Sequence, residues 1–145
     1  MTIRIMSRSN AIRYAMEAHS EAAAVISISD CDKDSPVLEL NPDNGIAARC
    51  MLKFDDVERG EVNAITAADV LKIVEFAADA AKEQDMLIVH CEAGVSRSAG
   101  VAAAIMKAVN GSDMEVFRNR RYVPNMTCYR AVLDAFYDEG RIHSP

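Results

Sequence analysis

Hydrophobic and polar positions form two alternating patterns along the chain. Short apolar runs are typical of strands covered on both faces of a sheet, and they occupy residues 3–6, 23–29, 48–54 and 86–90. Helices are predicted where a capping residue or apolar side chains at helical spacing follow such a run: residues 7–18, 66–84, 99–109, 112–121 and 126–137. This alternation predicts an α/β fold with a central, mostly parallel sheet of four to five strands and helices on both faces.

The segment around residue 90 is the centre of this pattern. Residues 86–90 carry no formal charge, and residues 99–109 are apolar almost all round except for Lys107, so both segments must be buried. Ligands of parallel sheets bind beyond the carboxyl ends of the strands. The residues that follow His90 are therefore the leading candidates for a functional site.

Length and composition are those of an ordinary globular protein. The 145 residues contain no repeat, low-complexity tract or linker, so we expect a single domain over residues 1–145. Half of the residues are hydrophobic, which excludes intrinsic disorder. The longest nearly uncharged apolar stretch, residues 99–106, is far shorter than the ~20 residues that span a bilayer. Because Arg4 and Arg8 interrupt the apolar N-terminus, no secretory signal is predicted, and we expect a cytoplasmic protein that does not bind membranes.

Charge and cysteine content narrow the possible partners. A formal net charge of −6 argues against broad binding to nucleic acid or to an anionic membrane, so an anionic substrate would need a local positive site. The cysteines show neither a CxxC pair nor metal-ligand spacing, and we expect no metal and no cofactor. In a reducing compartment most such thiols are small buried hydrophobes. The sequence does not predict an oligomeric state.

Residues 90–98 have the composition of an anion-binding turn. Gly94 supplies the backbone freedom that such a turn needs, and inward-pointing N–H groups at a helix N-terminus favour an anion. Arg97 adds a planar fork of donors that can hold two phosphate oxygens. Cys91 begins this positive concavity, so we expect a lowered thiol pKa and a nucleophilic thiolate.

Each residue of this turn also has a plainer interpretation. An inert buried thiol at Cys91 would leave the charged Arg97 unexplained. His90 ends the strand, and we expect it to hold the loop by hydrogen bonds rather than to transfer protons. Ser98 is either an ordinary residue of the first helical turn or a hydrogen-bond donor to the Cys91 sulfur.

A run of consecutive residues resembles the signature loop of the cysteine-dependent protein tyrosine phosphatases: His90-Cys91-Glu92-Ala93-Gly94-Val95-Ser96-Arg97-Ser98. Its Gly-x-Ser-Arg-Ser ending looks most like the dual-specificity branch. Upstream, Lys53-Phe54-Asp55-Asp56 lies where that branch keeps its general-acid loop, and residues 120–125 resemble the segment that joins its last two helices. The resemblance covers about residues 46–138 and implies a phosphatase-like fold.

The resemblance also implies a role for each residue of the loop. Cys91 would attack phosphorus, and Arg97 would hold the phosphoryl oxygens together with the backbone of Glu92, Ala93, Gly94, Val95 and Ser96. An aspartic acid would protonate the leaving oxygen and then activate water.

The identity of that aspartic acid is open between two neighbours. Aligning Lys53-x-x-Asp with the family pattern favours Asp56 over Asp55, which would then be a turn residue. Asn125, which follows a proline as in the family, would support the loop from behind.

The same loop limits the substrate class. Glu92, Ala93 and Val95 stand where a phosphoinositide specialist would carry lysines, so the predicted partner is a phosphorylated protein or a small phosphomonoester. Phosphotyrosine is the expected substrate residue, with phosphoserine and phosphothreonine as alternatives. A group of arginines either borders the site and attracts acidic peptides or forms a solvated helix face: Arg118, Arg120, Arg121 and Arg130.

Two other functions fit parts of the pattern. A rhodanese-like sulfurtransferase also places a reactive cysteine between a strand and a helix, but Asp56 would then have no role. A phospho-residue binding module without turnover is the other alternative. The presence of Cys91, Arg97 and an upstream aspartate gives no support for a loss of activity.

Overall fold

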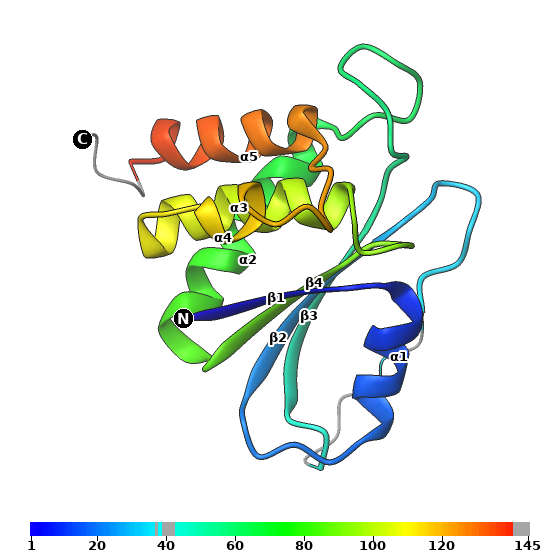
Figure 1. The fold of residues 1–145 in the computed structure, drawn as a ribbon, viewed down its shortest axis with the longest axis vertical. Coiled ribbons are helices and arrows are strands. Elements are labelled where there is room, and N and C mark those ends of the chain that lie inside the picture. The colour runs from blue at the N-terminus through cyan, green and yellow to red at the C-terminus, as the bar shows by residue number, and fades with distance from the viewer. Residues whose placement is uncertain (37, 39–42, 141–145) are drawn as a thin grey trace.

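A parallel sheet forms the middle of the fold. In the computed structural model, which describes residues 1–36, 38 and 43–140, four strands lie in the order β1-β4-β2-β3, and each neighbouring pair is parallel (Figure 1). The strands are β1 (Thr2–Met6), β2 (Ala23–Ser29), β3 (Ile46–Lys53) and β4 (Met86–His90). Every residue of the two central strands, β2 and β4, is buried. The predicted α/β fold with a mostly parallel central sheet is confirmed.

Helices cover both faces of this sheet (Figure 1). One face carries α1 (Arg8–Met16), and the other carries α2 (Ala67–Glu83), α3 (Arg97–Asn110), α4 (Met114–Phe117) and α5 (Met126–Asp138). The larger hydrophobic core lies beneath these four helices, and a smaller core lies beneath α1. No helix within the described residues has the length and apolar content needed to cross a bilayer.

Capping residues determine where the main helices begin. Ser7 Oγ accepts a hydrogen bond from Asn10 N at 3.1 Å at the start of α1. Thr66 and Asp69 form a reciprocal capping box at the start of α2, with bonds of 3.0 and 3.1 Å. Both helices therefore start at or next to the residues that the sequence predicts.

The helix predicted for residues 112–121 is wrong in length, because α4 ends at Phe117. Beyond it, the Asn119 side-chain oxygen accepts from Arg121 N at 3.0 Å, and the Asn119 carbonyl accepts from Tyr122 N at 3.1 Å. Such local side-chain bonds compete with helical hydrogen bonds. The chain therefore turns towards α5 instead of continuing the helix.

The parallel strands bring polar residues together at one edge of the sheet. Ser7 follows β1, Asp30 follows β2 and Cys91 follows β4, while Asp55 lies two residues beyond β3. This edge is on the right of Figure 1, where the strands run towards α1 and the long loops. The candidate site is built here.

Candidate active site

Cys91 lies directly beyond β4, at the start of the loop formed by residues 91–96, here called the 91–96 loop. Its side chain is buried, and Sγ lies 3.0 Å from Ser98 Oγ. Burial raises the pKa of the Cys91 thiol, but hydrogen bonds from the Ser98 hydroxyl and from the N–H groups of Ser98, Gly94 and Val95 lower it further, so the net pKa is below its ordinary value. The site therefore favours a thiolate surrounded by hydrogen-bond donors.

The 91–96 loop rests on the junction between β1 and α1. Gly94 has a φ of +71°, and a Cβ atom there would lie 2.7 Å from Met6 C and from Ser7 N. The backbone N–H of Arg8 donates to the Glu92 carbonyl at 3.1 Å. The close approach of the loop to this junction needs glycine at position 94, because only glycine adopts this φ freely and leaves room for the backbone of Met6 and Ser7.

Arg97 is the first residue of α3, and it is only 4% exposed. Its Nη1 donates to the Phe54 carbonyl at 2.7 Å and pairs with Asp30 Oδ1 at 2.7 Å. Both partners use the same nitrogen, so among the described residues the edge formed by Nε and Nη2 has no protein acceptor. That edge is the fork that matches two oxygens of a phosphate.

Asp56 is exposed and faces the 91–96 loop. Its Oδ1 accepts hydrogen bonds from Ser96 Oγ at 2.7 Å and from Asn125 Nδ2 at 2.9 Å. These bonds direct the carboxylate towards the loop that begins with Cys91. A carboxyl group in this position is suited to exchange a proton with a molecule bound in the loop.

Asp55 points to a different part of the molecule. Its carboxylate accepts bonds from Cys31 N at 2.9 Å and from Asn63 Nδ2 at 3.1 Å. The bond from the Cys31 backbone, followed by the bond from Asn63, lowers the pKa of the Asp55 carboxyl. Asn63 lies in a turn, since its φ is +65°, a conformation that asparagine tolerates. By accepting the bond from the Asn63 side chain, Asp55 holds this turn.

Asn125 joins three segments at the beginning of α5. Its Oδ1 caps the helix by accepting from Cys128 N at 3.0 Å. Its Nδ2 donates to Asp56 Oδ1 and to the Val57 carbonyl at 3.2 Å, and its backbone N–H donates to the Ser96 carbonyl at 2.9 Å. One side chain thus fixes the 91–96 loop relative to the Asp56 segment.

His90 is fully buried at the end of β4. Its Nε2 lies 2.6 Å from Ser27 Oγ, and its Nδ1 lies 3.2 Å from the Cys91 carbonyl oxygen. Burial lowers the pKa of His90 below its ordinary value. A neutral, enclosed imidazole is suited to hold the backbone of Cys91 in position.

Sequence reasoning missed Asp30 and Ser27, which contact Arg97 and His90. Both come from β2 or the residue after it, and both are polar positions in or beside a buried strand. A polar residue at the carboxyl end of a buried strand is the signal that could have indicated Asp30. The partner could not be identified without the order of the strands.

Glu92 belongs to the loop through its backbone, while its side chain points outward. Glu92 Oε1 lies 3.7 Å from Lys33 Nζ, which is 3.6 Å from Asp30 Oδ2. Both Lys33 and Glu92 are about half exposed, so this pairing contributes little stability. It partly neutralises a negative charge beside the loop.

Two hollows border Asp56, one acidic and one of mixed charge. On one side, Asp30, Asp32 and Asp55 line a hollow of about 510 Å³ with Asp56. On the other, a hollow of about 910 Å³ that Asp56 and Ser96 border is lined by Arg59 and Arg130 and also by Glu58 and Glu61, so it carries charges of both signs. Among the predicted group of arginines, Arg118 and Arg120 line a separate hollow beside α4.

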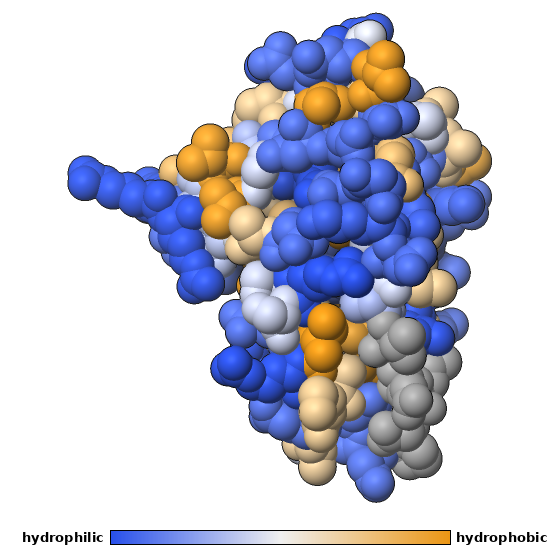
Figure 2. Space-filling model, turned by 90° about the vertical axis from the view of Figure 1, so that its right-hand side faces the viewer, coloured by the Kyte–Doolittle hydropathy of each residue, from blue (hydrophilic) through white to orange (hydrophobic). Residues whose placement is uncertain are grey.

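The face that carries the carboxyl ends of the strands is largely hydrophilic. Figure 2 views the molecule from the right-hand side of Figure 1 and shows hydrophobic residues only as small, separate patches on this face. A polar, charged surface around the buried Cys91 is suited to a phosphorylated or otherwise charged molecule.

Comparison with known proteins gives similarity in structure but not in sequence. No protein-family profile matches the chain, and no curated protein matches it. The structure of human DUSP28 is similar with a TM-score of 0.65 at 16% identity and covers 94% of each chain. The human tyrosine phosphatase-like serine/threonine/tyrosine-interacting protein is similar with a TM-score of 0.63 at 15% identity, covering 94% of this chain and 92% of that one.

A third similar structure is PTPMT1 in complex with PI(5)P, with a TM-score of 0.59, 20% identity and coverage of 95% of this chain and 91% of that one. All three extend over nearly the whole chain, so the likeness concerns the entire sheet and its helices. The phosphatase-like fold implied by the signature run is confirmed. The chain has the fold of the cysteine-dependent phosphatases of the dual-specificity type.

Proposed function

We propose that the protein is a cysteine-dependent phosphomonoester hydrolase that removes phosphate from phosphotyrosine in proteins, and from phosphoserine and phosphothreonine as further substrates. The observation that carries this proposal is the setting of Cys91. Its thiol has a lowered pKa and begins a loop that ends at the Nε–Nη2 edge of Arg97, for which the described part of the chain offers no acceptor. A thiolate facing an anion-binding cradle is a nucleophile placed for phosphoryl transfer.

In the first step, the Cys91 thiolate attacks phosphorus and forms a sulfur–phosphorus bond. The bond from phosphorus to the ester oxygen breaks, and the protonated carboxyl group of Asp56 gives its proton to that oxygen. Arg97 and the N–H groups of the 91–96 loop stabilise the charge on the phosphoryl oxygens.

In the second step, a water molecule attacks the phosphorus of the phosphocysteine. The Asp56 carboxylate accepts a proton from this water, and the sulfur–phosphorus bond breaks to return the Cys91 thiolate. Ser98 supports this departure, because its hydroxyl lies 3.0 Å from Sγ and can stabilise the negative sulfur. Inorganic phosphate leaves, and the enzyme is restored to its starting state.

His90 and Asn125 are positioning residues in this proposal. His90 holds the carbonyl of Cys91 from the interior of the sheet. Asn125 holds Asp56 and Ser96 at a fixed separation through its side chain and backbone. Neither residue reaches the reacting atoms itself.

Hydrolysis of p-nitrophenyl phosphate tests this proposal directly. We expect the purified protein to release p-nitrophenolate and phosphate, and Cys91→Ser to abolish turnover. Cys91→Ser should still bind a phosphotyrosine peptide in an anisotropy titration. Binding by the wild-type protein without turnover would instead show a binding module, and sulfur transfer from thiosulfate to cyanide without phosphatase activity would show a sulfurtransferase.

A substrate panel resolves the specificity. Matched peptides that carry phosphotyrosine, phosphoserine or phosphothreonine are compared by kcat/KM with a short-chain phosphoinositide, since one similar structure holds PI(5)P. We expect phosphotyrosine to be the best substrate and the phosphoinositide the poorest, because no lysine lies in the 91–96 loop. Preference for the phosphoinositide would overturn the assignment of protein substrates.

A further inference from the structure

The segment that carries Asp56 is closed on itself. Asp55 N donates to the Asn63 carbonyl at 2.7 Å, and Asn63 Nδ2 donates to Asp55 Oδ2 at 3.1 Å, so the two ends of residues 55–63 are joined twice. At the far side, Glu58 N donates to Glu61 Oε2 at 2.6 Å, and Glu61 N donates to the Glu58 carbonyl at 3.2 Å. Residues 55–63, here called the acid segment, therefore form a compact loop that can tilt as one unit.

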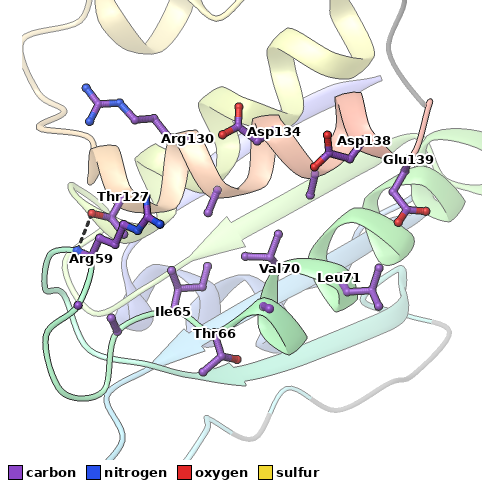
Figure 3. Close-up of a pocket in the computed structure, with 15 residues that line it drawn as sticks. Arg59, Ile65, Thr66, Val70, Leu71, Thr127, Arg130, Asp134, Asp138 and Glu139 are labelled. Carbon is purple, nitrogen blue, oxygen red and sulfur yellow. Dashed lines mark hydrogen bonds between the residues drawn. The ribbon is translucent and has the colours of Figure 1, made fainter.

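The acid segment is attached to the beginning of α5 at two places. The first is Asn125, whose Nδ2 donates to Asp56 Oδ1 and to the Val57 carbonyl. The second is Thr127, whose Oγ1 accepts a hydrogen bond from the Arg59 backbone N–H at 3.0 Å, the dashed line in Figure 3. A segment that is held at one place can pivot about it, whereas a second attachment fixes its direction.

The two attachments differ in what else they hold. Asn125 also accepts from Cys128 N, and its backbone N–H donates to the Ser96 carbonyl. The Thr127 hydroxyl bonds to Arg59 N alone among the described residues. Because Asn125 is the N-cap of α5, the helix does not need the Thr127 hydroxyl for its own start. Thr127 therefore contributes its hydroxyl to the acid segment and not to the helix.

The two oxygens of the Asp56 carboxyl group have different surroundings. Oδ1 accepts from Ser96 Oγ at 2.7 Å and from Asn125 Nδ2 at 2.9 Å, while no described residue donates to Oδ2. Two donors at Oδ1 leave Oδ2 as the oxygen that carries the transferable proton. Proton transfer needs about 2.6–3.2 Å between Oδ2 and the leaving oxygen. A displacement of Asp56 by about 1 Å, which a small tilt of the acid segment causes, is therefore enough to slow the reaction.

We propose that Thr127 is a positioning residue for the general acid. By accepting the Arg59 N–H, it prevents the acid segment from pivoting about Asn125 and keeps Asp56 Oδ2 within reach of the leaving oxygen. Thr127 does not touch the reacting atoms, and its effect passes through the backbone between Asp56 and Arg59. This inference rests on the proposed function and adds to it a residue from α5.

Thr127→Val tests this role, because valine keeps the shape and β-branching of threonine but accepts no hydrogen bond. For a phosphotyrosine peptide, we expect kcat/KM to fall about three- to tenfold, the effect of losing one hydrogen bond. With 6,8-difluoro-4-methylumbelliferyl phosphate, whose leaving group needs little protonation, the fall should be at most about twofold. Thr127→Ser keeps the hydroxyl and should restore the wild-type ratio of kcat/KM between the two substrates.

Two further variants distinguish positioning from a general structural role. In an Asp56→Asn background, Thr127→Val should cause no further loss of kcat/KM for the peptide, because the acid that Thr127 positions is absent. Thr2→Val makes the same exchange at the beginning of β1, at the opposite end of the sheet, and should leave the ratio between the two substrates unchanged. A merely structural role of Thr127 would lower kcat/KM for both substrates alike, and its effect would multiply with that of Asp56→Asn.

Amide hydrogen exchange at Arg59, followed by NMR, measures the attachment without any turnover. We expect exchange of the Arg59 N–H to be faster in Thr127→Val and to remain close to wild type in Thr127→Ser. Unchanged exchange in Thr127→Val, or an equal loss of kcat/KM with both substrates, would overturn the role of Thr127 and leave the hydrolase standing. Absence of turnover by the wild-type protein would overturn the proposed function, and the role of Thr127 with it.

Discussion

Cys91 and Cys128 are both buried thiols, yet their environments shift the thiol pKa in opposite directions. Burial raises the pKa of Cys128 to about 12, with added repulsion from Asp56 and Cys91 and an opposing effect of Arg97. At Cys91, hydrogen bonds to sulfur outweigh burial and lower the pKa. Thiolate character therefore depends on directed donors and not on burial alone.

This difference predicts selective alkylation. With iodoacetamide below neutral pH, we expect Cys91 to react first, because the pKa of each of the other three thiols is raised. Burial raises the pKa of Cys50 and Cys128. Desolvation raises the pKa of Cys31, and the carboxylate of Asp55 raises it further. Peptide mass spectrometry identifies the modified residue. Ser98→Ala should move the midpoint of the alkylation rate to higher pH, whereas Ser20→Ala, at an exposed serine, should not. Reaction at the exposed Cys31 ahead of Cys91 would contradict the assignment.

Asp55 and Asp56 are adjacent, but only one faces the loop. We expect Asp56→Asn to lower kcat for a phosphotyrosine peptide by ~10²–10⁴, the usual contribution of a general acid. The loss should be smaller with p-nitrophenyl phosphate, whose leaving group needs less protonation. Asp55→Asn is the matched control, and its effect should be mild because Asp55 bonds to Cys31 and Asn63 instead. Equally mild effects of both substitutions would exclude Asp56 as the acid.

At the scale of the elements, a comparison of two glycines distinguishes the effect of a positive φ from the effect of close packing. Gly94 and Gly111 have φ values of +71° and +86°, but a Cβ atom would meet the β1–α1 junction only at Gly94. Alanine at either position should lower the free energy of unfolding by about 1–2 kcal/mol through the unfavourable φ. Only Gly94→Ala should also displace the 91–96 loop.

Urea denaturation and inhibition by vanadate measure the two effects separately. Gly94→Ala is expected to weaken vanadate inhibition strongly, while Gly111→Ala, which closes α3 far from the loop, should leave it unchanged. The same vanadate affinity in both variants would show that the junction does not support the loop.

The elements that could be predicted from the sequence are those with a local signal. β2 and β4 are mostly apolar, uncharged runs, and α2 has both helical periodicity and a capping box, so their limits agree with the structure to within about a residue or two. For the short helix α4 the sequence signals a start but no end, and the bond that Asn119 Oδ1 accepts from Arg121 N lies beyond Phe117, where the helix ends. Local patterns therefore determined the elements but not every boundary.

The candidate site divides in the same way. Residues 90–98 are contiguous, so the loop and its chemistry could be read as a unit. The contacts of Arg97 with Asp30 and of His90 with Ser27 depend on β4 lying beside β2, which periodicity does not specify. The choice between Asp55 and Asp56 depends on the conformation of the segment after β3, since adjacent side chains in an extended chain point in opposite directions.

At the scale of the whole molecule, the donors suited to hold a phosphate are local, while the net charge of the protein is negative. The formal net charge is −6, and the donors at the site are Arg97 and the backbone N–H groups beside Cys91. A phosphorylated substrate is thus held by directed donors at the site and not by the charge of the surface as a whole. Overall charge therefore excludes nonspecific anion binding but not a specific anionic substrate.

The stability of the whole molecule is linked to pH through His90. Burial lowers the pKa of His90, and the charge of Arg8 lowers it further. The hydrogen bond with the Cys91 carbonyl and the charge of Glu92 raise it, but the net pKa lies below the ordinary value of 6.5. The unfolded chain keeps the ordinary value of about 6.5. Between these two pKa values the unfolded state binds more protons, so the free energy of unfolding falls as the pH drops below about 6.5 and is insensitive to His90 above it.

Urea denaturation of Cys91→Ser, from about pH 8 to about pH 5.5, isolates this linkage because it removes the thiolate that also titrates. We expect the free energy of unfolding to fall with a slope of at most about 1.4 kcal/mol per pH unit for one proton. Adding His90→Gln should flatten that slope, whatever its effect on stability at high pH, because glutamine does not titrate. An unchanged slope in the double variant would show that another group binds the proton, and that His90 does not cause the loss of stability at low pH.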